Sequence, residues 1–311
     1  MKPKVIVICG PTASGKTSLS IELAKRINGE IISCDSMQIY KDMTIGTAKP
    51  TVEEMDGVPH HLIDFVLPSE RYSVADFKKA ATKKIEEILG RNKTPIIVGG
   101  TGLYVDALVY NIEYLELETD LKYRQELENL IEQKGLEELY ERAKQIDGQA
   151  MQSISKNDKK RIMRVLEIYH QTGKTKTQLE AESRLTPSPY DYIVFAITMD
   201  REKLYERINL RVDIMLKNGL IEEVQSLLNK YKEFPTAMQG LGYKEVVEYL
   251  DGKTTKEEMI EKLKMETRRY AKRQLTWFRK NKDIKWIDGL APLEQNIQYI
   301  LEEYSGEEEN K

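Results

Sequence analysis

The stretch GPTASGKT, Gly10 to Thr17, decides the fold of the amino-terminal part of the chain. It matches the pattern G-x-x-x-x-G-K-[ST], follows the apolar run VIVIC (5–9) and precedes the helical pattern SLSIELAKRI. In such a loop the glycines let successive amides point at one anion, the lysine adds a charge, and the Thr17 hydroxyl suits a magnesium ion. The residues expected to hold the phosphates are Gly10, Pro11, Thr12, Ala13, Ser14, Gly15, Lys16 and Thr17.

Three further apolar runs indicate a parallel sheet around this loop. They are EIISC (30–34), PIIVG (95–99) and YIVFAITM (192–199). Helical patterns separate the first three of the four runs, VIVIC, EIISC and PIIVG, from one another. Near-continuous apolar runs are typical of strands that are covered on both faces. The pattern predicts an α/β fold, with a P-loop-type parallel sheet core and helices on both faces.

The region from 119 to 187 has a different pattern. Helix-like segments dominate it, including LKYRQELENLIEQKGLEELYERAKQI, which is broken at Gly135, and DKKRIMRVLEIYHQTG. No convincing strand interrupts them. We therefore expect an all-helical insertion domain at 119–187, between the two parts of the core at 1–118 and 188–311.

Composition sets broad limits on the class of protein. The chain has 311 residues, of which 40% are hydrophobic and 32% are charged, as in a globular protein with a polar surface. No apolar run of about 18 residues occurs, which predicts no membrane span, and the amino terminus does not resemble a signal peptide. Both cysteines lie in apolar runs, so buried reduced thiols and a cytoplasmic protein are expected. The lack of a long heptad pattern favours a monomer.

The net charge of −3 hides a segregation of charge along the chain. Residues 113–142 have a balance of −6, whereas residues 156–176 have +5 and residues 262–285 have +8. Two separate basic blocks indicate a nucleic-acid partner, and the alternative is that each block is a solvated helix face. In the first block Lys160, Arg161 and Arg164 form a basic edge. In the second, Tyr270, Gln274 and Trp277 share a helix face, which predicts that Trp277 packs in the core.

Other polar residues follow the predicted strands. Asp35 and Asp200 each close a strand-like run, and either could supply a carboxylate near the magnesium ion. Asp35 has the better position, because ligands bind at the carboxyl ends of strands in open α/β sheets; the alternative is a turn or N-cap residue. His60 and His61 are adjacent without a metal-binding spacing, so we expect a structural or hydrogen-bonding role.

Nine motifs, in order, resemble the tRNA dimethylallyltransferases, also called tRNA isopentenyltransferases. They are GPTASGKT, DSMQIYKDMTIGTAKP, PHHLID, YSVADF, IIVGGTGLY, NDKKRIMRVLEIY, RVDIMLKNGLIEEV, QGLGYKE and AKRQLTWFRK. The carboxyl-terminal EEYSGEEENK contains neither Cys nor His, so the chain is similar to the short bacterial type, for which no zinc is expected.

The resemblance implies a reaction. A dimethylallyl group would pass from dimethylallyl diphosphate to the exocyclic amine of the adenosine directly 3′ of the anticodon, in tRNAs that read codons beginning with U. Pyrophosphate would leave, and Mg²⁺ would be required. The rival interpretations are a small-molecule kinase with ATP in the loop, a prenyltransferase acting on free adenine nucleotides, and a non-enzymatic RNA-binding protein gated by a nucleotide.

The resemblance also implies roles for individual residues. Asp35 would be the base, Thr101 would help to hold the target adenine, and Arg211 would contact the diphosphate. The remaining residues implied or considered for contact with tRNA are Ser36, Met37, Gln38, Tyr123, Lys159, Lys160, Arg161, Ile162 and Met163.

Overall fold

The computed structural model describes residues 2–114, 120–183 and 185–306. Two compact units make up the chain: Met1–Leu108 together with Pro189–Lys311, and Val109–Ser188. The first unit contains the parallel sheet and the second is helical. The expected domain boundary near 118 and the acidic end of the chain from 307 lie outside the described residues.

A six-stranded sheet forms the centre of the first unit, with the strand order β3-β2-β4-β1-β5-β6. Every paired strand is parallel to its neighbour, which confirms the predicted fold class. The strands are β1 (Lys4–Cys9), β2 (Gly29–Ser33), β3 (His60–His61), β4 (Thr94–Gly99), β5 (Asp191–Thr198) and β6 (Lys285–Asp288). The four strands predicted from apolar runs are β1, β2, β4 and β5, and both cysteines are buried as expected.

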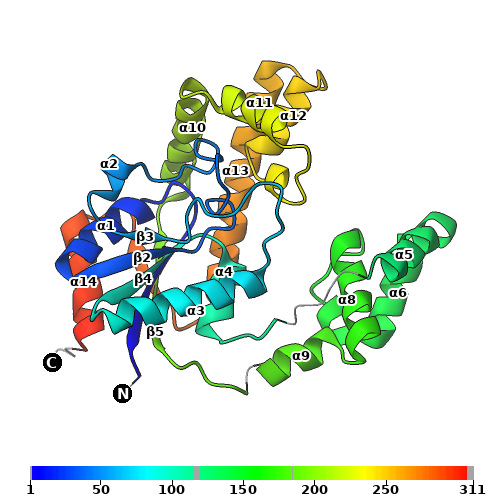
Figure 1. Ribbon diagram of the computed structural model, residues 1–311, viewed down its shortest axis with the longest axis horizontal. Coiled ribbons are helices and arrows are strands. Elements are labelled where there is room, and N and C mark those ends of the chain that lie inside the picture. The colour runs from blue at the N-terminus through cyan, green and yellow to red at the C-terminus, as the bar shows by residue number, and fades with distance from the viewer. Residues whose placement is uncertain (1, 115–119, 184, 307–311) are drawn as a thin grey trace. The chain divides into compact units, whose positions relative to one another are not determined.

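Helices cover both faces of this sheet (Figure 1). On one face α1 (Lys16–Arg26) and α14 (Leu293–Ser305) pack together, and their residues Leu23, Ile297 and Ile300 join a core cluster with the sheet. On the other face lie α3 (Val74–Gly90) and α4 (Gly102–Val109). Phe77 of α3 stacks on Tyr104 of α4 with ring centroids 4.0 Å apart. Apolar burial on both faces explains why the strands are almost continuously apolar.

Further helices extend the first unit beyond the carboxyl edge of the sheet. They are α10 (Arg201–Lys217), α11 (Leu220–Lys230), α12 (Tyr243–Leu250) and α13 (Lys256–Phe278), with short segments α2 (Val52–Met55) and η1 (Ala237–Gln239). These helices share a core with the segment that follows β2, through Ile39, Tyr40 and Met43. The segment after β2 is therefore fixed by packing against α10 to α13.

The two short edge strands were not predicted. β3 has two residues and β6 has four, too few for a periodic pattern to be recognised. In β3, His61 Nε2 lies 2.7 Å from Glu30 Oε2, and His60 Nδ1 lies 2.8 Å from the Val58 carbonyl oxygen. Glu30 also pairs with Arg91 at 2.6 Å and Lys93 at 2.9 Å. The two histidines thus have hydrogen-bonding roles at the edge of the sheet.

The helical unit has its own hydrophobic core. It comprises α5 (Leu121–Lys134), α6 (Leu136–Ile146), α7 (Gly148–Met151), α8 (Lys159–Thr172) and α9 (Lys176–Ser183). Gly135 separates α5 from α6 as predicted, with a φ of 83°. Leu127, Leu139 and Leu166 are among the residues that fill the core. The buried Asp147 accepts hydrogen bonds from the Thr177 amide and hydroxyl at 2.9 and 2.6 Å, which fixes the start of α9.

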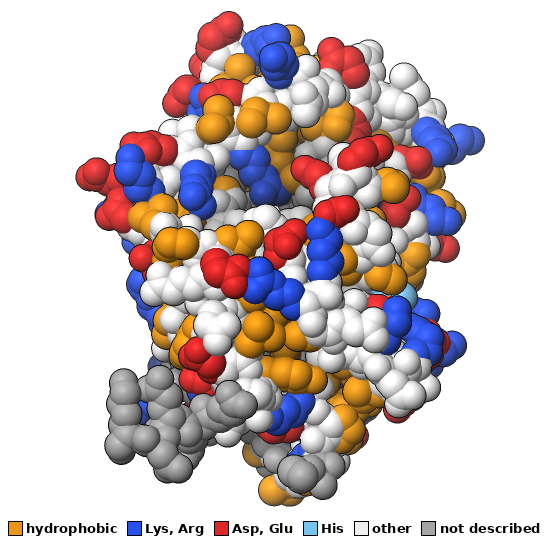
Figure 2. All heavy atoms as spheres, turned by 90° about the vertical axis from the view of Figure 1, so that its left-hand side faces the viewer, with side chains coloured by type: hydrophobic (Ala, Val, Ile, Leu, Met, Phe, Trp, Pro, Cys, Tyr) orange, Lys and Arg blue, Asp and Glu red, His pale blue; other side chains and the backbone are white. Residues whose placement is uncertain are grey.

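Charges on the face of the molecule that carries α1, α2 and α14 are mixed in sign (Figure 2). Arg26 makes a two-pronged pair with Glu294 at 2.6 and 2.5 Å, and Lys25 pairs with Glu22 at 3.1 Å. This face therefore presents no large field of one sign. Within the described residues, no helix combines the length and apolar character that a membrane crossing requires.

Candidate active site

The loop from Gly10 to Thr17 curls around the side chain of Lys16. Gly15 has a φ of 93°, which glycine adopts without strain, and Ala13 has a φ of 62°, a left-handed conformation that is uncommon for a residue with a Cβ atom. Helix α1 begins at Lys16, so its first amides face the loop. The Lys16 ammonium donates to the carbonyl oxygens of Gly10 at 3.1 Å and Pro11 at 2.6 Å.

Two cationic side chains create an excess of positive charge here. Burial, followed by the nearby charge of Arg211, lowers the pKa of Lys16 to about 8, against an opposing effect from Asp35. Burial also lowers the pKa of Arg211, which extends from α10. The buried Nε of Arg211 has no hydrogen-bond partner among the described residues. A buried donor without a partner is costly, so this position favours an anionic ligand.

Asp35 begins a tight turn at the end of β2. Its Oδ1 accepts hydrogen bonds from the amides of Met37 at 2.8 Å and Gln38 at 3.3 Å. The Ser36 amide donates to Thr101 Oγ1 at 3.0 Å, which ties this turn to the loop after β4. The second carboxylate oxygen of Asp35 accepts no hydrogen bond from the part of the chain that the structure describes. Asp35 is thus both a turn residue and a carboxylate with a free oxygen.

Asp200, the other candidate carboxylate, has a different role. It is the N-cap of α10, where its Oδ1 accepts from the amides of Glu202 at 2.9 Å and Lys203 at 3.1 Å. It is not among the residues that line the cavity. Asp35 is therefore the carboxylate that the fold brings to the phosphate-binding loop.

The segment after the Asp35 turn is held from two directions. The Gln38 side-chain amide donates to the carbonyl oxygens of Thr47 at 3.3 Å and Ala48 at 3.2 Å. The Glu223 carboxylate, from α11, accepts from the amides of Thr44, Ile45 and Gly46 at 2.9, 2.7 and 3.1 Å. These bonds fix the loop that forms one wall of the site.

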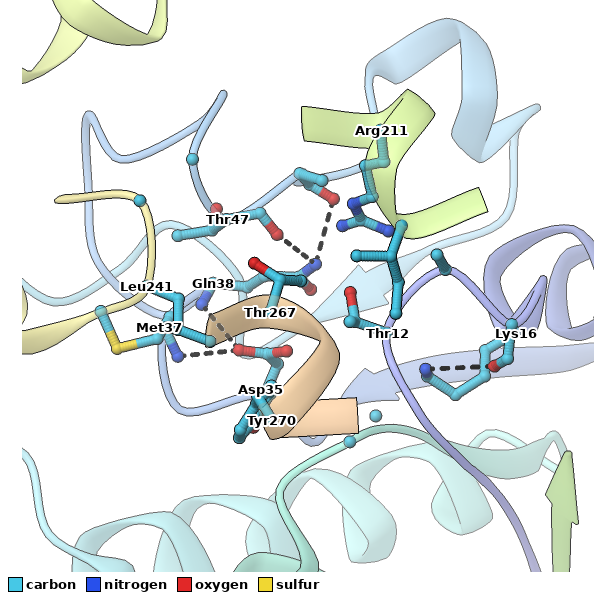
Figure 3. A pocket seen from close by; sticks show the side chains of 18 of the residues that line it. Thr12, Lys16, Asp35, Met37, Gln38, Thr47, Arg211, Leu241, Thr267 and Tyr270 are labelled. Atoms are coloured by element: carbon cyan, nitrogen blue, oxygen red, sulfur yellow. Dashed lines mark hydrogen bonds between the residues drawn. The ribbon is translucent and has the colours of Figure 1, made fainter. Parts of the chain in front are cut away.

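A cavity of about 740 Å³ lies between these elements (Figure 3). Thr12, Asp35 and Arg211 surround the same space, with Met37 and Leu241 beside it. Apolar side chains complete the wall, namely Ile208, Val212 and Leu263. The cavity thus combines an anion-binding end, a carboxylate and an apolar surface, which suits a ligand with a charged diphosphate and a hydrocarbon group.

Most of the site residues predicted in the first unit lie in or beside this cavity. The lining includes residues 12–17 of the loop, residues 35–38 of the turn, and Arg211. Thr101 joins them through its hydrogen bond with Ser36. The remaining predicted residues, Tyr123 and residues 159–163, belong to the helical unit.

Two predicted tRNA contacts have buried side chains. Ile162 is fully buried and Met163 is 3% exposed, and both belong to the core of the helical unit. They lie on the apolar side of the amphipathic helix α8, so their side chains face the core of this unit. In contrast, Lys160 is exposed and makes no ion pair with a described residue, whereas Arg161 pairs with Asp158 at 3.3 Å and Lys159 pairs with Glu128. Tyr123 stacks on His170, with ring centroids 3.7 Å apart.

Two residues that organise the site, Glu223 and Gln274, were not predicted as site residues. Gln274 of α13 is 6% exposed and bonds to both the phosphate-binding loop and the loop after β4. A signal for it existed, because Gln274 was expected to share a helix face with Tyr270 and Trp277. Glu223 gave no comparable signal, since it contacts amides that precede it by nearly 180 residues.

The residues present fit a magnesium ion that shares its ligands with a substrate. No group of three or more His, Cys, Asp or Glu side chains that could form a metal cage occurs in the described residues. Thr17 lines the cavity, and its hydroxyl could supply one oxygen ligand. Mg²⁺ is usually bound by one or two protein oxygens, with substrate phosphates and waters supplying the remaining ligands.

Comparisons with known proteins agree with this chemistry. The sequence profile of the IPP transferase family matches residues 38–281. The tRNA dimethylallyltransferase of Acetivibrio thermocellus is 51% identical over 303 residues, covering 96% of this chain and 97% of the relative.

Solved structures show the same relationship. The full-length tRNA isopentenylpyrophosphate transferase of Bacillus halodurans superposes with a TM-score of 0.74 at 46% identity, covering 98% of this chain and 96% of that one. A eukaryotic dimethylallyltransferase, solved acting on tRNA, superposes with a TM-score of 0.81 at 34% identity, covering 98% and 79%. With a cavity suited to an allylic diphosphate and relatives that match almost end to end, the chain belongs to the tRNA dimethylallyltransferase family.

Proposed function

We propose that this enzyme transfers a dimethylallyl group from dimethylallyl diphosphate to tRNA, and that pyrophosphate is released. The acceptor is the exocyclic amine of the adenosine directly 3′ of the anticodon, in tRNAs that read codons beginning with U. The observation that carries the proposal is that Lys16, Arg211 and Asp35 line one cavity whose other wall is apolar. A phosphoryl-transfer site would not need the apolar wall.

The phosphate-binding loop would stabilise the leaving group. The bond that breaks joins the allylic carbon to the diphosphate oxygen, so negative charge grows on the diphosphate as the bond lengthens. Lys16 and the first amides of α1 face the loop, and the unpaired Nε of Arg211 would donate to a diphosphate oxygen. Donors that are already in place stabilise this developing charge without reorganisation.

Asp35 would receive the proton from the attacking amine. The lone pair of an adenine amine is delocalised into the ring, which makes the amine a weak nucleophile until its proton is removed. The turn uses only Oδ1 of Asp35, which leaves Oδ2 able to accept that proton as the new carbon–nitrogen bond forms. Thr101, whose hydroxyl already contacts Ser36, would border the base beside this carboxylate.

A magnesium ion would be held by the Thr17 hydroxyl together with oxygens of the diphosphate itself. When bound, Mg²⁺ would neutralise part of the charge on the departing pyrophosphate. The protein's own contribution is to hold the Thr17 hydroxyl in the first turn of α1 and to surround the allylic group with apolar side chains.

The helical unit would bind the acceptor tRNA. Lys160 and Arg161 present positive charge along α8, and phosphate contacts of this kind fix the position of an RNA without reading its sequence. The target base would leave its stack to enter the cavity. Bases in a loop are already partly unstacked, which reduces the cost of that movement.

One experiment distinguishes this function from its rivals. The protein is incubated with dimethylallyl diphosphate labelled in the prenyl group, magnesium, unmodified tRNA, ATP and AMP. Label is measured in tRNA and in free nucleotides, and pyrophosphate release and ATP consumption are measured separately. We expect label in tRNA with one pyrophosphate per transfer. Consumption of ATP without labelled tRNA would indicate a kinase, and label only in free adenine nucleotides would indicate the other prenyltransferase.

A further inference from the structure

Helix α13 presents one partly buried face to the carboxyl edge of the sheet. Tyr270, Gln274 and Trp277 are four and three residues apart, so they lie on the same side of the helix. Gln274 is 6% exposed, and the Trp277 ring nitrogen donates to Asp106 Oδ2 at 2.9 Å. The basic residues of the same helix belong to the second basic block, in which nucleic-acid contacts were expected, whereas this face was given no role in the function proposed above.

Gln274 joins two loops that come from different strands. Its Oε1 accepts a hydrogen bond from the backbone amide of Thr12 at 3.0 Å. Its Nε2 donates to the backbone carbonyl oxygen of Gly100 at 2.9 Å. One end of the side chain must accept and the other must donate, and among charged or amide side chains of this length only glutamine does both.

The sheet itself stops holding these loops together just before this point. Strands β1 and β4 are neighbours, and their last paired residues are Cys9 and Gly99. From Gly10 and Gly100 onward the backbones follow separate paths, towards α1 and α4. The hydrogen bonds of Gln274 therefore provide a link directly beyond the end of the ladder.

The lack of a side chain at Gly100 leaves room for this contact with Gln274. A Cβ atom added at Gly100 would lie 2.1 Å from Nε2 of Gln274, far closer than any real Cβ contact. The next residue, Thr101, interacts with the Tyr270 side chain on the same helix face and accepts the Ser36 amide at 3.0 Å. The face of α13 thus contacts the diphosphate loop and the residues that adjoin the Asp35 turn.

We propose that Gln274 is a positioning residue that sets the distance between the bound diphosphate and the attacking amine. The inference rests on the proposed function, because that function places the donor at the Thr12 loop and the acceptor beside Thr101 and Asp35. Reacting atoms must approach within about 3–3.5 Å, and a misplacement of about 1 Å can reduce a rate on the order of a hundredfold. A fixed link between the two loops holds that geometry before the substrates arrive.

Gln274→Met tests the link, because methionine has a similar length and makes neither hydrogen bond. We expect kcat for prenyl transfer to fall on the order of tenfold to a hundredfold. The affinities for inorganic pyrophosphate and for tRNA should change little, since their own contacts remain. Thr276→Ala, at an exposed position two residues along the same helix, is the matched control and should keep the wild-type kcat.

Gln274→Glu provides a second, pH-dependent readout. The carboxyl can still accept the Thr12 amide, but when ionised it places an oxygen against the Gly100 carbonyl oxygen. Protonation turns that oxygen into a donor, and burial raises the pKa of such a carboxyl. The ratio of variant kcat to wild-type kcat should therefore rise severalfold as the pH falls from about 8 to about 6. A wild-type kcat in Gln274→Met, or a constant ratio in Gln274→Glu, would overturn the proposal.

Amide hydrogen exchange separates this inference from the proposed function. In Gln274→Met, without substrates, exchange should accelerate in the peptides that cover residues 10–15 and 99–106, and it should stay unchanged in Thr276→Ala. Unchanged exchange in Gln274→Met means that Gln274 does not hold the loops, whatever the activity. Failure of the wild-type protein to label tRNA would reject the function, while the exchange result would still decide the link.

Discussion

The side-chain hydroxyl of Thr101 accepts a hydrogen bond from the backbone amide of Ser36 at 3.0 Å. This bond connects the loop after β4 to the turn that Asp35 begins after β2. The two strands are themselves paired, up to Ser33 and Val98. The hydroxyl therefore continues the link between the strands into the region where the proposed chemistry takes place.

Replacing Thr101 by valine should lower the rate of prenyl transfer. Valine keeps the shape but leaves the Ser36 amide without its acceptor, at a cost of about 1–3 kcal/mol, and the Asp35 turn becomes less well fixed. Single-turnover rates with saturating substrates should fall about tenfold or more. Thr101→Ser keeps the hydroxyl and should stay near the wild-type rate. Equal rates in the valine and serine variants would contradict a role for this bond.

Asp35→Asn separates the two roles of this residue. Asparagine retains the oxygen that accepts the Met37 and Gln38 amides, but it cannot take a proton from the amine. We expect kcat to fall on the order of 10²–10⁴-fold, the range for loss of a general base, with unchanged thermal stability and tRNA affinity. Asp35→Ala, which also removes the turn bonds, should in addition lower stability. A near wild-type rate in Asp35→Asn would make Asp35 a turn residue only.

The sequence was most informative where a structure depends on neighbouring residues. The loop at Gly10–Thr17 and the position of Asp35 at a strand end both follow from short local patterns, and residues 12–17 of the loop and Asp35 line the cavity. Ile162 and Met163 were predicted as RNA contacts because they stand in a motif beside Lys160 and Arg161, and the structure places both side chains in a hydrophobic core. The amphipathic period of α8 assigns them to the opposite, buried side.

The features that were missed depend on long-range contacts. Gln274 bonds to Thr12, 262 residues earlier, and Glu223 bonds to Gly46, 177 residues earlier. A single sequence contains no local pattern that pairs such residues. The edge strand β3 is also defined by its partner, because its two residues become a strand only when Ile31 and Ile32 lie alongside.

Diphosphate binding should weaken as the pH rises through about 8. Burial and the charge of Arg211 lower the pKa of Lys16 to about 8, so the free enzyme loses this charge just above neutral pH. An anion in the loop favours the protonated form, so binding above pH 8 should be accompanied by proton uptake. Calorimetric titration of pyrophosphate in buffers with different ionisation enthalpies measures that uptake.

Lys16→Arg is the control for this titration. An arginine stays charged throughout the range, so any pH dependence that remains in the variant comes from the pyrophosphate or from other groups. Subtracting the pH dependence of the variant from that of the wild type leaves the contribution of Lys16 to pyrophosphate binding. The same pH dependence and proton uptake in both proteins would show that Lys16 does not titrate near pH 8.

Glu30 should contribute to stability in a pH-dependent way. Burial raises its pKa, but hydrogen bonds from Arg91, His61 and Lys93 outweigh this effect and lower it to about 2, from an ordinary value of 4.5. Because the folded-state pKa is depressed, the contribution is complete above about pH 4.5 and is lost as the pH falls towards 2. Glu30→Gln should lower the free energy of unfolding at pH 7 by about 2–3 kcal/mol, measured by urea denaturation.

Glu87→Gln supplies the comparison for Glu30. Glu87 pairs with Lys84 at 2.6 Å on the surface of α3, where both side chains are about one-third exposed. Water screens an exposed pair, so it contributes little to stability and this variant should be close to the wild type. Equal destabilisation by the two substitutions would show that the Glu30 cluster contributes no more to the free energy of unfolding than an exposed ion pair does.

Lys160→Gln should weaken tRNA binding without changing the chemistry. Lys160 is exposed on α8 and has no ion-pair partner among the described residues, so its charge is available to a phosphate. Each phosphate contact releases counterions, and its loss reduces the slope of log affinity against log salt concentration by about 1. Affinity should fall at low salt and converge with the wild type at high salt, whereas kcat with saturating tRNA should be unchanged.

Lys176→Gln tests whether the effect is specific to this edge of α8. Lys176 belongs to the same helical unit and carries the same charge, but it already pairs with Glu180 on α9. Its removal frees a carboxylate and should alter the salt dependence much less than the loss of Lys160. If both substitutions reduce the slope equally, the helical unit attracts tRNA through its overall charge. If neither does, the basic block at 156–176 is a solvated helix face and the RNA-binding surface must be sought elsewhere.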